Sequence, residues 1–421
     1  MKILIIDDSK DFRSLVRLYL SKELSQASIE EYDFEALGRP GEDYPWHDYD
    51  VLLLDYKLGD SEDGLEWLKS YSKKPGFPPT VVLTAEGDEY VAVRAVKLGA
   101  ADYINKKDIS PKRLKEIVEE AAEFNETKLA KQSENINEAA QILKNIRSTS
   151  KRLPEEGLDI GYKFVRLIGQ GGMSYVYMAE RVSDGLSLVL KIIDLTKAKD
   201  HIIVRRFIQE AELIAELNSP FVVKIYEHGM TEEYGYIAME FFSRGDLKQR
   251  MELTITPDVA FNYMTHITYG LEAIHNIGVV HRDLKPGNIM FRGDDSLALA
   301  DFGISKKLGT NSDLTTIGQV LGTPHYMSPE QGEGKPVDYR SDIYSAGVML
   351  YELLTGQKPF TARTPAALIY QHVHAEIPQL PTELRQYQTI IDKTLAKDPA
   401  DRYQTARQLI EIFESAEKDF H

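Results

Sequence analysis

The chain has 421 residues, which is too many for one hydrophobic core, so we expect two or three domains. Its formal net charge of −16 argues against nucleic acid or an anionic membrane as its main partner. Because it contains no cysteine, disulfides and thiolate metal sites are excluded, and no apolar run approaches the roughly 20 residues that span a bilayer.

The first predicted element is a strand at Lys2–Ile6, which leaves no room for a signal peptide before it. Together with the lack of cysteine, this favours a soluble, cytoplasmic protein. Short apolar runs alternate with amphipathic helical stretches up to residue 120, as a doubly wound parallel α/β sheet requires. The predicted strands cover residues 2–6, 29–34, 51–54, 80–83 and 102–104, of which 29–34 has the weakest pattern.

The carboxyl ends of these strands carry most of the chemical information. Asp7 and Asp8 follow the first strand, Asp55 the third, Thr84 the fourth, and Lys106 lies just past the fifth. Ligands of open α/β sheets bind at this edge, so the five side chains should converge. Three carboxylates in one place repel one another unless a cation lies among them, which implies a Mg²⁺ site with oxygen ligands.

This ordered set resembles the flavodoxin-like receiver domain of bacterial two-component response regulators, over residues 1–122. The resemblance implies that Asp55 accepts a phosphoryl group and that Asp7 and Asp8 hold Mg²⁺ together with it. It also implies that Thr84 bonds the phosphate and that Lys106 pairs with it. Tyr103 stands where the family's switch aromatic usually lies. An upstream histidine kinase or a small phosphodonor is the implied partner.

The sequence departs from this family in three places. Lys107 replaces the proline that usually follows the lysine, so the turn there cannot rely on proline. Lys57 and Glu86 could form an ion pair across the mouth of the site and hinder the hydrolytic water, which would make the phosphate long-lived. Three helix breakers interrupt the second helix, which is expected to be short or lacking: Pro40, Gly41 and Pro45.

The stretch after the receiver reads as a helical connector. A helix should start at Pro111 with Ser110 as its N-cap. Residues 123–153 continue with a short heptad pattern and end in a hinge rich in small and basic residues. Two alternatives stay open: a dimeric coiled coil, which predicts a homodimer, or a helix that packs on one of the chain's own domains. The heptad positions are Leu129, Ile136, Ala139, Leu143 and Ile146.

The next region begins with a glycine-rich loop, Gly169–Val176, between two strand-like runs. Such a loop lets the backbone fold over phosphates, although Ser174 replaces its third glycine. Lys191 ends the following apolar run, and Glu210 lies in a helical stretch, 205–217.

The run His281–Asn288 supplies most of the groups needed to transfer a phosphoryl group to a hydroxyl. Asp283 can accept a proton from the nucleophile, Lys285 can steady the phosphate, and Asn288 offers an oxygen ligand for Mg²⁺. With the preceding motifs, this run resembles the catalytic loop of eukaryotic-type (Hanks-type) Ser/Thr protein kinases of bacteria. The resemblance covers residues 160–417 and implies an α+β bilobal kinase domain that uses ATP and Mg²⁺ to phosphorylate protein substrates.

The resemblance assigns further roles. Lys191 would pair with Glu210, and Asp301 of the run 301–303 would bind Mg²⁺. Glu330 should form an ion pair with Arg402, and Asp342 fits the residue that holds the catalytic-loop backbone. The ATP-binding residues would be Ile168, Gly169, Gly171, Ser174, Val176, Lys191, Met239, Glu240 and Phe242, with Met239 as gatekeeper and backbone groups bonding adenine.

The segment between Asp301 and Glu330 is the expected activation segment. Arg282 would place a cation near it that a phosphate could neutralise. Thr315 and Thr316 are the candidates to carry that phosphate. Thr323 is interpreted as structural.

The resulting hypothesis is a Ser/Thr kinase regulated by phosphorylation of Asp55. One alternative is a receiver-controlled signalling scaffold whose kinase fold binds nucleotide without turnover. The other is an active kinase whose receiver serves only as a dimerisation module. The sign of the regulation stays open.

Overall fold

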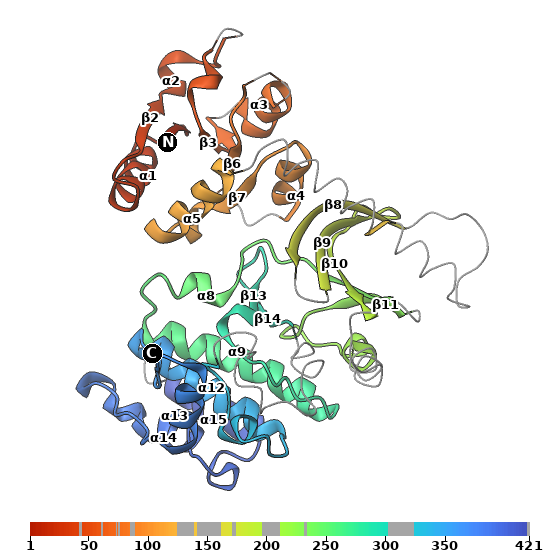
Figure 1. Ribbon diagram of the computed structural model, residues 1–421, viewed down its shortest axis with the longest axis vertical. Helices are drawn as coiled ribbons and strands as arrows, with labels where there is room; N and C mark the ends of the chain where they lie inside the picture. The colour runs from red at the N-terminus through yellow and green to blue at the C-terminus, as the bar shows by residue number, and fades with distance from the viewer. Residues whose placement is uncertain are drawn as a thin grey trace, which may run out of the picture. The chain divides into compact units, whose positions relative to one another are not determined.

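The computed structural model describes residues 1–41, 44–59, 62–72, 74, 76–84, 89–123, 139–140, 161–170, 174–195, 211–230, 234–301 and 324–418 (Figure 1). The chain divides into two compact units. The first comprises Met1–Ile193, Gly229–Arg244 and Arg292–Asp295. The second comprises Asp194–His228, Gly245–Phe291 and Ser296–His421. Across the described residues, no helix is both long and apolar enough to cross a membrane.

The N-terminal part of the first unit is a five-stranded parallel sheet with strand order β2-β1-β3-β6-β7. The strands are β1 (Lys2–Ile6), β2 (Ser28–Tyr32), β3 (Val51–Asp55), β6 (Thr80–Thr84) and β7 (Asp102–Asn105). The doubly wound α/β prediction is confirmed. The strand predicted for 29–34 differs most in its end, whereas the other predicted ends agree to within one residue. β2 stops at Tyr32 because Asp33 caps the next helix by accepting a hydrogen bond from Ala36 N at 3.1 Å.

Helices cover both faces of this sheet (Figure 1). Side chains of a strand alternate between faces, so Ile3 and Ile5 of β1 pack with α1 (Lys10–Glu23) and α5 (Pro111–Ala122). Leu4 and Ile6 pack on the other face with α3 (Gly64–Tyr71) and α4 (Glu89–Lys97). A strand buried on both faces needs a continuous apolar run, and Ile3-Leu4-Ile5-Ile6 provides it.

The second helix is short, as predicted. The helix α2 (Phe34–Leu37) has four residues and ends at Gly38, whose φ of 64° favours glycine. The following backbone is held by Tyr71, whose hydroxyl donates to Pro40 O at 2.6 Å. Trp46 begins the 3₁₀ helix η1 (Trp46–Asp48), and its buried ring packs against the ring of Tyr71.

The start of α5 is confirmed: Ser110 accepts a hydrogen bond from Arg113 N at 3.1 Å, and Pro111 is the first helical residue. The predicted linker 123–153 lies outside the described residues except for Glu123, Ala139 and Ala140.

A second five-stranded sheet, here called the second sheet, follows with strand order β11-β12-β10-β9-β8. Its strands are β8 (Tyr162–Gln170), β9 (Ser174–Arg181), β10 (Ser187–Asp194), β11 (Ile225–Met230) and β12 (Tyr234–Glu240). β8 and β9 are antiparallel neighbours, as are β9 and β10. The predicted glycine-rich loop therefore joins adjacent strands, and Lys191 lies on the third of them.

The second unit is mainly helical. Its elements are α8 (Leu247–Arg250), α9 (Pro257–Asn276), β13 (Ile289–Phe291), β14 (Leu297–Leu299), α11 (Pro329–Gly332), α12 (Tyr339–Thr355), α13 (Pro365–His374), α14 (Gln388–Thr394) and α15 (Ala406–Lys418). α12 is buried all round from Ser341 to Leu354, so it lies at the centre of the unit. Gly347 lets α14 approach, because a Cβ there would lie 2.6 Å from the Cβ of Thr394.

Candidate functional site

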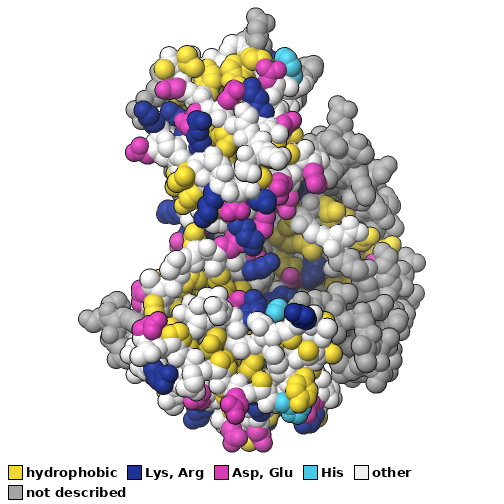
Figure 2. Space-filling view, turned by 60° about the vertical axis from the view of Figure 1, so that its left-hand side comes forward, with side chains coloured by type: hydrophobic (Ala, Val, Ile, Leu, Met, Phe, Trp, Pro, Cys, Tyr) yellow, Lys and Arg dark blue, Asp and Glu magenta, His cyan; other side chains and the backbone are white. Residues whose placement is uncertain are grey.

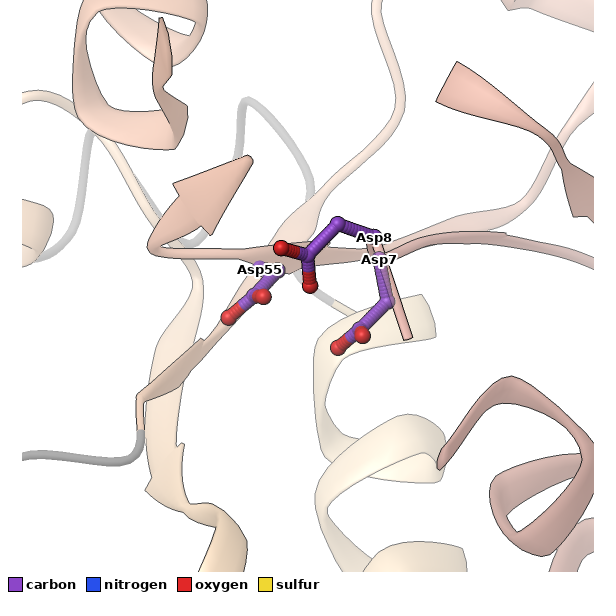
Figure 3. A group of neighbouring side chains, drawn as sticks. All are labelled: Asp7, Asp8 and Asp55. Atoms are coloured by element: carbon purple, nitrogen blue, oxygen red, sulfur yellow. The ribbon is translucent and has the colours of Figure 1, made fainter. Parts of the chain in front are cut away.

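Three carboxylates gather at the edge of the parallel sheet. Asp7 and Asp8 follow β1, Asp55 ends β3, and one oxygen from each lies within 4.8 Å of the others (Figure 3). Asp7 and Asp55 are buried, whereas Asp8 is half-buried. The parallel pairing of β1 with β3 brings them together, since it aligns the carboxyl ends of both strands.

Lys106 is the cation among the described residues that lies between these carboxylates. Its Nζ is 2.7 Å from Asp7 Oδ2 and 2.8 Å from Asp55 Oδ2. Burial, followed by repulsion from Asp7, raises the pKa of Asp55 to about 7 although Lys106 opposes the shift. One ammonium does not balance three carboxylates, and the remaining negative charge suits a divalent cation with oxygen ligands. The residues present therefore fit Mg²⁺.

Of the other two predicted residues, Thr84 lies at the same edge, whereas Tyr103 lies within β7 and pairs in register with Val82. Thr84 ends β6, is buried, and pairs in register with Asn105, the residue before Lys106. Tyr103 lies on β7 and packs against the receiver core. The turn after β7 is the 3₁₀ helix η2 (Lys106–Asp108), which Asn105 caps by accepting a hydrogen bond from Lys107 N at 2.9 Å. The Asn105 side chain thus stabilises this turn, in which Lys107 replaces the proline usual in the family. Glu86, the suggested partner of Lys57, lies outside the described residues.

Two residues that the motif analysis missed position this cluster. Arg13 is buried on α1, and its Nη1 donates to Asp7 O at 2.5 Å. Position 64 needs glycine because its backbone lies close to that of Asp55, and a Cβ there would lie 1.9 Å from Asp55 O. Arg13 could have been found from its spacing, since it stands one helical turn before Val16 on the face that is otherwise apolar.

The second sheet carries part of the predicted ATP-binding set. Lys191 on β10 pairs in register with Val176 on β9, and Gly169 on β8 also pairs with Val176. Ile168 is exposed and Ser174 begins β9. Gly171 and Glu210 lie outside the described residues, so the pairing of Lys191 with Glu210 stays a prediction.

The predicted hinge follows β12. Met239 and Glu240 end the strand, and Phe242 is buried. Arg292 holds the Glu240 carboxylate at both oxygens, with Nε to Oε1 at 2.5 Å and Nη2 to Oε2 at 3.0 Å. The side chain of Glu240 is therefore engaged by Arg292, and the role of the Glu240 backbone in bonding adenine stays a prediction.

The catalytic-loop residues converge on Asp283. Lys285 Nζ lies 2.6 Å from Asp283 Oδ2. Asn288 Nδ2 donates to Asp283 O at 2.7 Å and to Asp301 O at 3.2 Å. Asn288 therefore ties the proposed base to the segment that carries the second predicted Mg²⁺ ligand, Asp301. Asp301 itself is exposed, with a φ of 50°.

Asp342 at the start of α12 holds the backbone of this loop. Its carboxylate accepts hydrogen bonds from His281 N at 2.8 Å and Arg282 N at 2.9 Å, and His275 Nε2 lies 2.8 Å from Oδ2. Arg282 has a φ of 65°, which is costly for a residue with a side chain. The buried carboxylate stabilises that conformation. Sequence analysis predicted Asp342 but missed His275.

A buried ion pair braces the same unit. Arg402 Nη1 and Nη2 each lie 2.8 Å from an oxygen of Glu330, and Ser341 also donates to this carboxylate. Burial alone would raise the pKa of Glu330, but the hydrogen bonds from Arg402 and Ser341 lower it. The geometry agrees with the predicted pair. The activation-segment candidates Thr315 and Thr316, with Thr323, lie outside the described residues.

A sheet followed by a helical unit with this catalytic loop is the architecture of a protein kinase. The chain belongs to the protein kinase family: the protein kinase domain matches residues 162–412, more than half of the chain. The response regulator receiver domain matches residues 3–119, in agreement with the carboxylate cluster.

The relatives found by comparison are bacterial serine/threonine kinases. A probable serine/threonine-protein kinase of Corynebacterium efficiens is 37% identical over 263 residues, which cover 59% of this chain and 40% of the relative. Serine/threonine-protein kinase PrkC of Bacillus subtilis is 36% identical over 254 residues, covering 59% and 39%. PknB of Mycobacterium leprae is 34% identical over 259 residues, covering 59% and 42%. The chain thus spans about two fifths of the length of these relatives.

Proposed function

We propose that this chain is an ATP-dependent protein serine/threonine kinase whose activity is regulated by phosphorylation of Asp55. The observation that carries the kinase assignment is the convergence of Lys285, Asn288 and Asp342 on the loop that presents Asp283. A fold that had lost its activity would have no need to keep this set together.

In the kinase reaction, Asp283 would accept the proton of the substrate hydroxyl as its oxygen attacks the γ-phosphorus of ATP and the bond to ADP breaks. Lys285, whose ammonium already lies beside Asp283, would neutralise charge on the transferring group. Asn288 and Asp301 would hold Mg²⁺, which supplies further neutralisation when it is bound.

In the receiver, an oxygen of Asp55 would attack the phosphorus of the donor while the donor's own bond to phosphorus breaks. Asp7, Asp8 and Asp55 would hold Mg²⁺, and Lys106 with Thr84 would bond the new phosphate. A small phosphodonor or a histidine kinase would supply the group, and the connector would support a homodimer. The cytoplasmic location stays a prediction.

Phosphorylation of a generic basic protein by ATP tests the kinase reaction. Wild type should transfer phosphate and Asp283→Asn should not, whereas equal inactivity of both would favour the scaffold alternative. Repeating the assay with a small phosphodonor, wild type against Asp55→Ala, tests the regulation. A wild-type kinase rate and oligomeric state that both ignore the phosphodonor would refute it and favour the receiver as a dimerisation module only.

A further inference from the structure

The turn that follows β13, Arg292–Asp295, belongs to the first unit together with the predicted hinge, residues 239–242. Arg292 holds the carboxylate of Glu240 at two points, with Nε to Oε1 at 2.5 Å and Nη2 to Oε2 at 3.0 Å. Its guanidinium carbon also lies 5.6 Å from the centroid of the buried Phe242 ring. One side chain of the turn therefore contacts both the start and the end of the segment 240–242.

A second ion pair joins the same turn to the chain just after the hinge. Arg244 Nη1 lies 2.5 Å from Asp295 Oδ2, and the side chain of Arg244 is only 5% exposed. The two pairs are opposite in sign, because the hinge side supplies the acid of one pair and the base of the other. We call these two pairs, Glu240–Arg292 and Arg244–Asp295, the hinge clamp.

The Glu240–Arg292 pair differs from an ordinary surface ion pair. Acidic and basic side chains are interspersed on the face of the molecule that Figure 2 shows, and most exposed pairs of this kind contribute little to stability. The side chains of Arg292 and Glu240 are only 18% and 16% exposed, so water screens their attraction less. Two parallel hydrogen bonds to one carboxylate also fix its orientation, which a single contact does not.

The turn that carries Arg292 is itself well ordered. Its two flanking strands pair antiparallel, with Phe291 opposite Leu297. Asp295 N donates to Arg292 O at 3.1 Å, which closes the turn. Asp295 has a φ of 74°, a left-handed conformation that aspartate tolerates better than most residues. The hinge clamp therefore ties the hinge to a fixed turn.

We propose that Arg292 is a positioning residue for nucleotide binding. By holding the Glu240 carboxylate at two points, it fixes the hinge backbone in one conformation, and the pair of Arg244 with Asp295 holds the chain where it leaves the hinge. Backbone N–H and C=O groups bond adenine only when they point in the required directions. A hinge that is already ordered binds the base without the entropic cost of ordering the segment. The inference rests on the proposed function, because it takes residues 239–242 as the adenine site.

Titration calorimetry with ADP and Mg²⁺ on the full chain tests this role without any turnover. Arg292→Gln should weaken ADP binding about tenfold, which corresponds to about 1.4 kcal/mol. Arg292→Lys should also weaken it, because an ammonium keeps the charge but cannot reproduce the two-point contact. ADP affinity equal to that of the wild type in both variants would overturn the proposal.

A matched control is available at the turn between β9 and β10. Arg181 holds Asp184 in the same two-point geometry, with Nε to Oδ1 at 2.9 Å and Nη2 to Oδ2 at 2.5 Å. Arg181→Gln removes an equivalent ion pair from the second sheet but no contact of the hinge. It should bind ADP like the wild type. A loss as large as that of Arg292→Gln would show a general effect of charge or stability and would overturn the specific role of Arg292.

A double-mutant cycle shows whether Arg292 acts through Glu240. The variants are Glu240→Gln, Arg292→Gln and the two combined. If the ion pair is what positions the hinge, the combined variant should bind ADP no more weakly than the weaker single variant. Losses that simply add would mean that the two side chains act independently, which would overturn the clamp. Should Arg292→Gln fail to fold by circular dichroism, Arg292→Lys, which keeps the cation, takes its place in the comparison.

The kinetic signature distinguishes positioning of the nucleotide from a general weakening of the fold. In phosphorylation of a generic basic protein, Arg292→Gln should raise KM for ATP about tenfold and change kcat by less than about twofold. The reason is that Arg292 touches the hinge, whereas Asp283 is held by Lys285 and Asn288. A fall in kcat with unchanged KM for ATP would overturn the positioning role.

ADP binding requires neither phosphoryl transfer nor phosphate on Asp55, so the inference and the proposed function can fail separately. A wild-type chain that binds ADP but transfers no phosphate would overturn the proposed kinase activity and leave Arg292 to be judged by calorimetry. Active wild type with unchanged ADP affinity in Arg292→Gln and Arg292→Lys would overturn the inference alone. A wild-type chain that does not bind ADP would overturn both.

Discussion

Binding of Mg²⁺ to the receiver should weaken as the pH falls from 8 to 6. The pKa of Asp55 is raised to about 7, chiefly by burial and by Asp7, so below pH 7 a proton competes with the metal for this carboxylate. For one competing proton, the apparent dissociation constant rises by a factor of about 11 at pH 6 and about 1.1 at pH 8. We therefore expect affinity to fall about tenfold between these two values.

Titration calorimetry of the full chain without nucleotide measures this change. Both tryptophans of the chain, Trp46 and Trp67, lie in the receiver, so their fluorescence during thermal unfolding reports the Mg²⁺ effect on that domain alone. Asp55→Asn should bind Mg²⁺ weakly and show little dependence on pH. Equal affinity at pH 6 and pH 8, or the same pH dependence in Asp55→Asn, would refute the assignment of this proton to Asp55.

The same pKa shift fixes the sign of a stability effect in metal-free protein. An acid whose pKa is raised on folding holds its proton more tightly in the folded state. Asp55 therefore favours the folded state at acidic pH, and that contribution is lost as the pH rises from about 4, the ordinary pKa of an aspartate, to about 7, its pKa in the folded protein. Mg²⁺ should restore stability at the upper end of this range.

Three substitutions test the supporting geometry. Gly64→Ala should lower the receiver's unfolding temperature and its phosphorylation, because the new Cβ would lie 1.9 Å from Asp55 O; unchanged values would contradict the close approach. Glu330→Gln should cost about 3–5 kcal/mol in denaturant unfolding followed by circular dichroism, since it leaves Arg402 buried without its anion, and a cost below about 1 kcal/mol would show that the pair is solvated. Asp342→Asn should lower kcat at least tenfold with little change in KM for ATP, because charged hydrogen bonds worth about 1.5–3 kcal/mol are lost. A normal kcat in this variant would show that Asp342 does not hold the catalytic-loop backbone.

The strand ends were predictable because two independent signals coincide there. A continuous apolar run predicts a strand buried on both faces, and a polar residue directly after it can only lie at the sheet edge. That logic brings Asp55 and Lys106 together although 51 residues separate them. The ion pair of Glu330 with Arg402 was predictable only through the family resemblance, because nothing local links residues 72 positions apart.

Other features depend on tertiary contacts that no local pattern carries. The strand β2 ends at Tyr32 because Asp33 caps the next helix. This capping interaction overrides the apolar pattern that predicted a strand over residues 29–34. His275 could not be assigned without knowing that α12 places Asp342 beside it. The pairing of Arg166 with Asp102 joins two domains, each of which gives a complete pattern by itself.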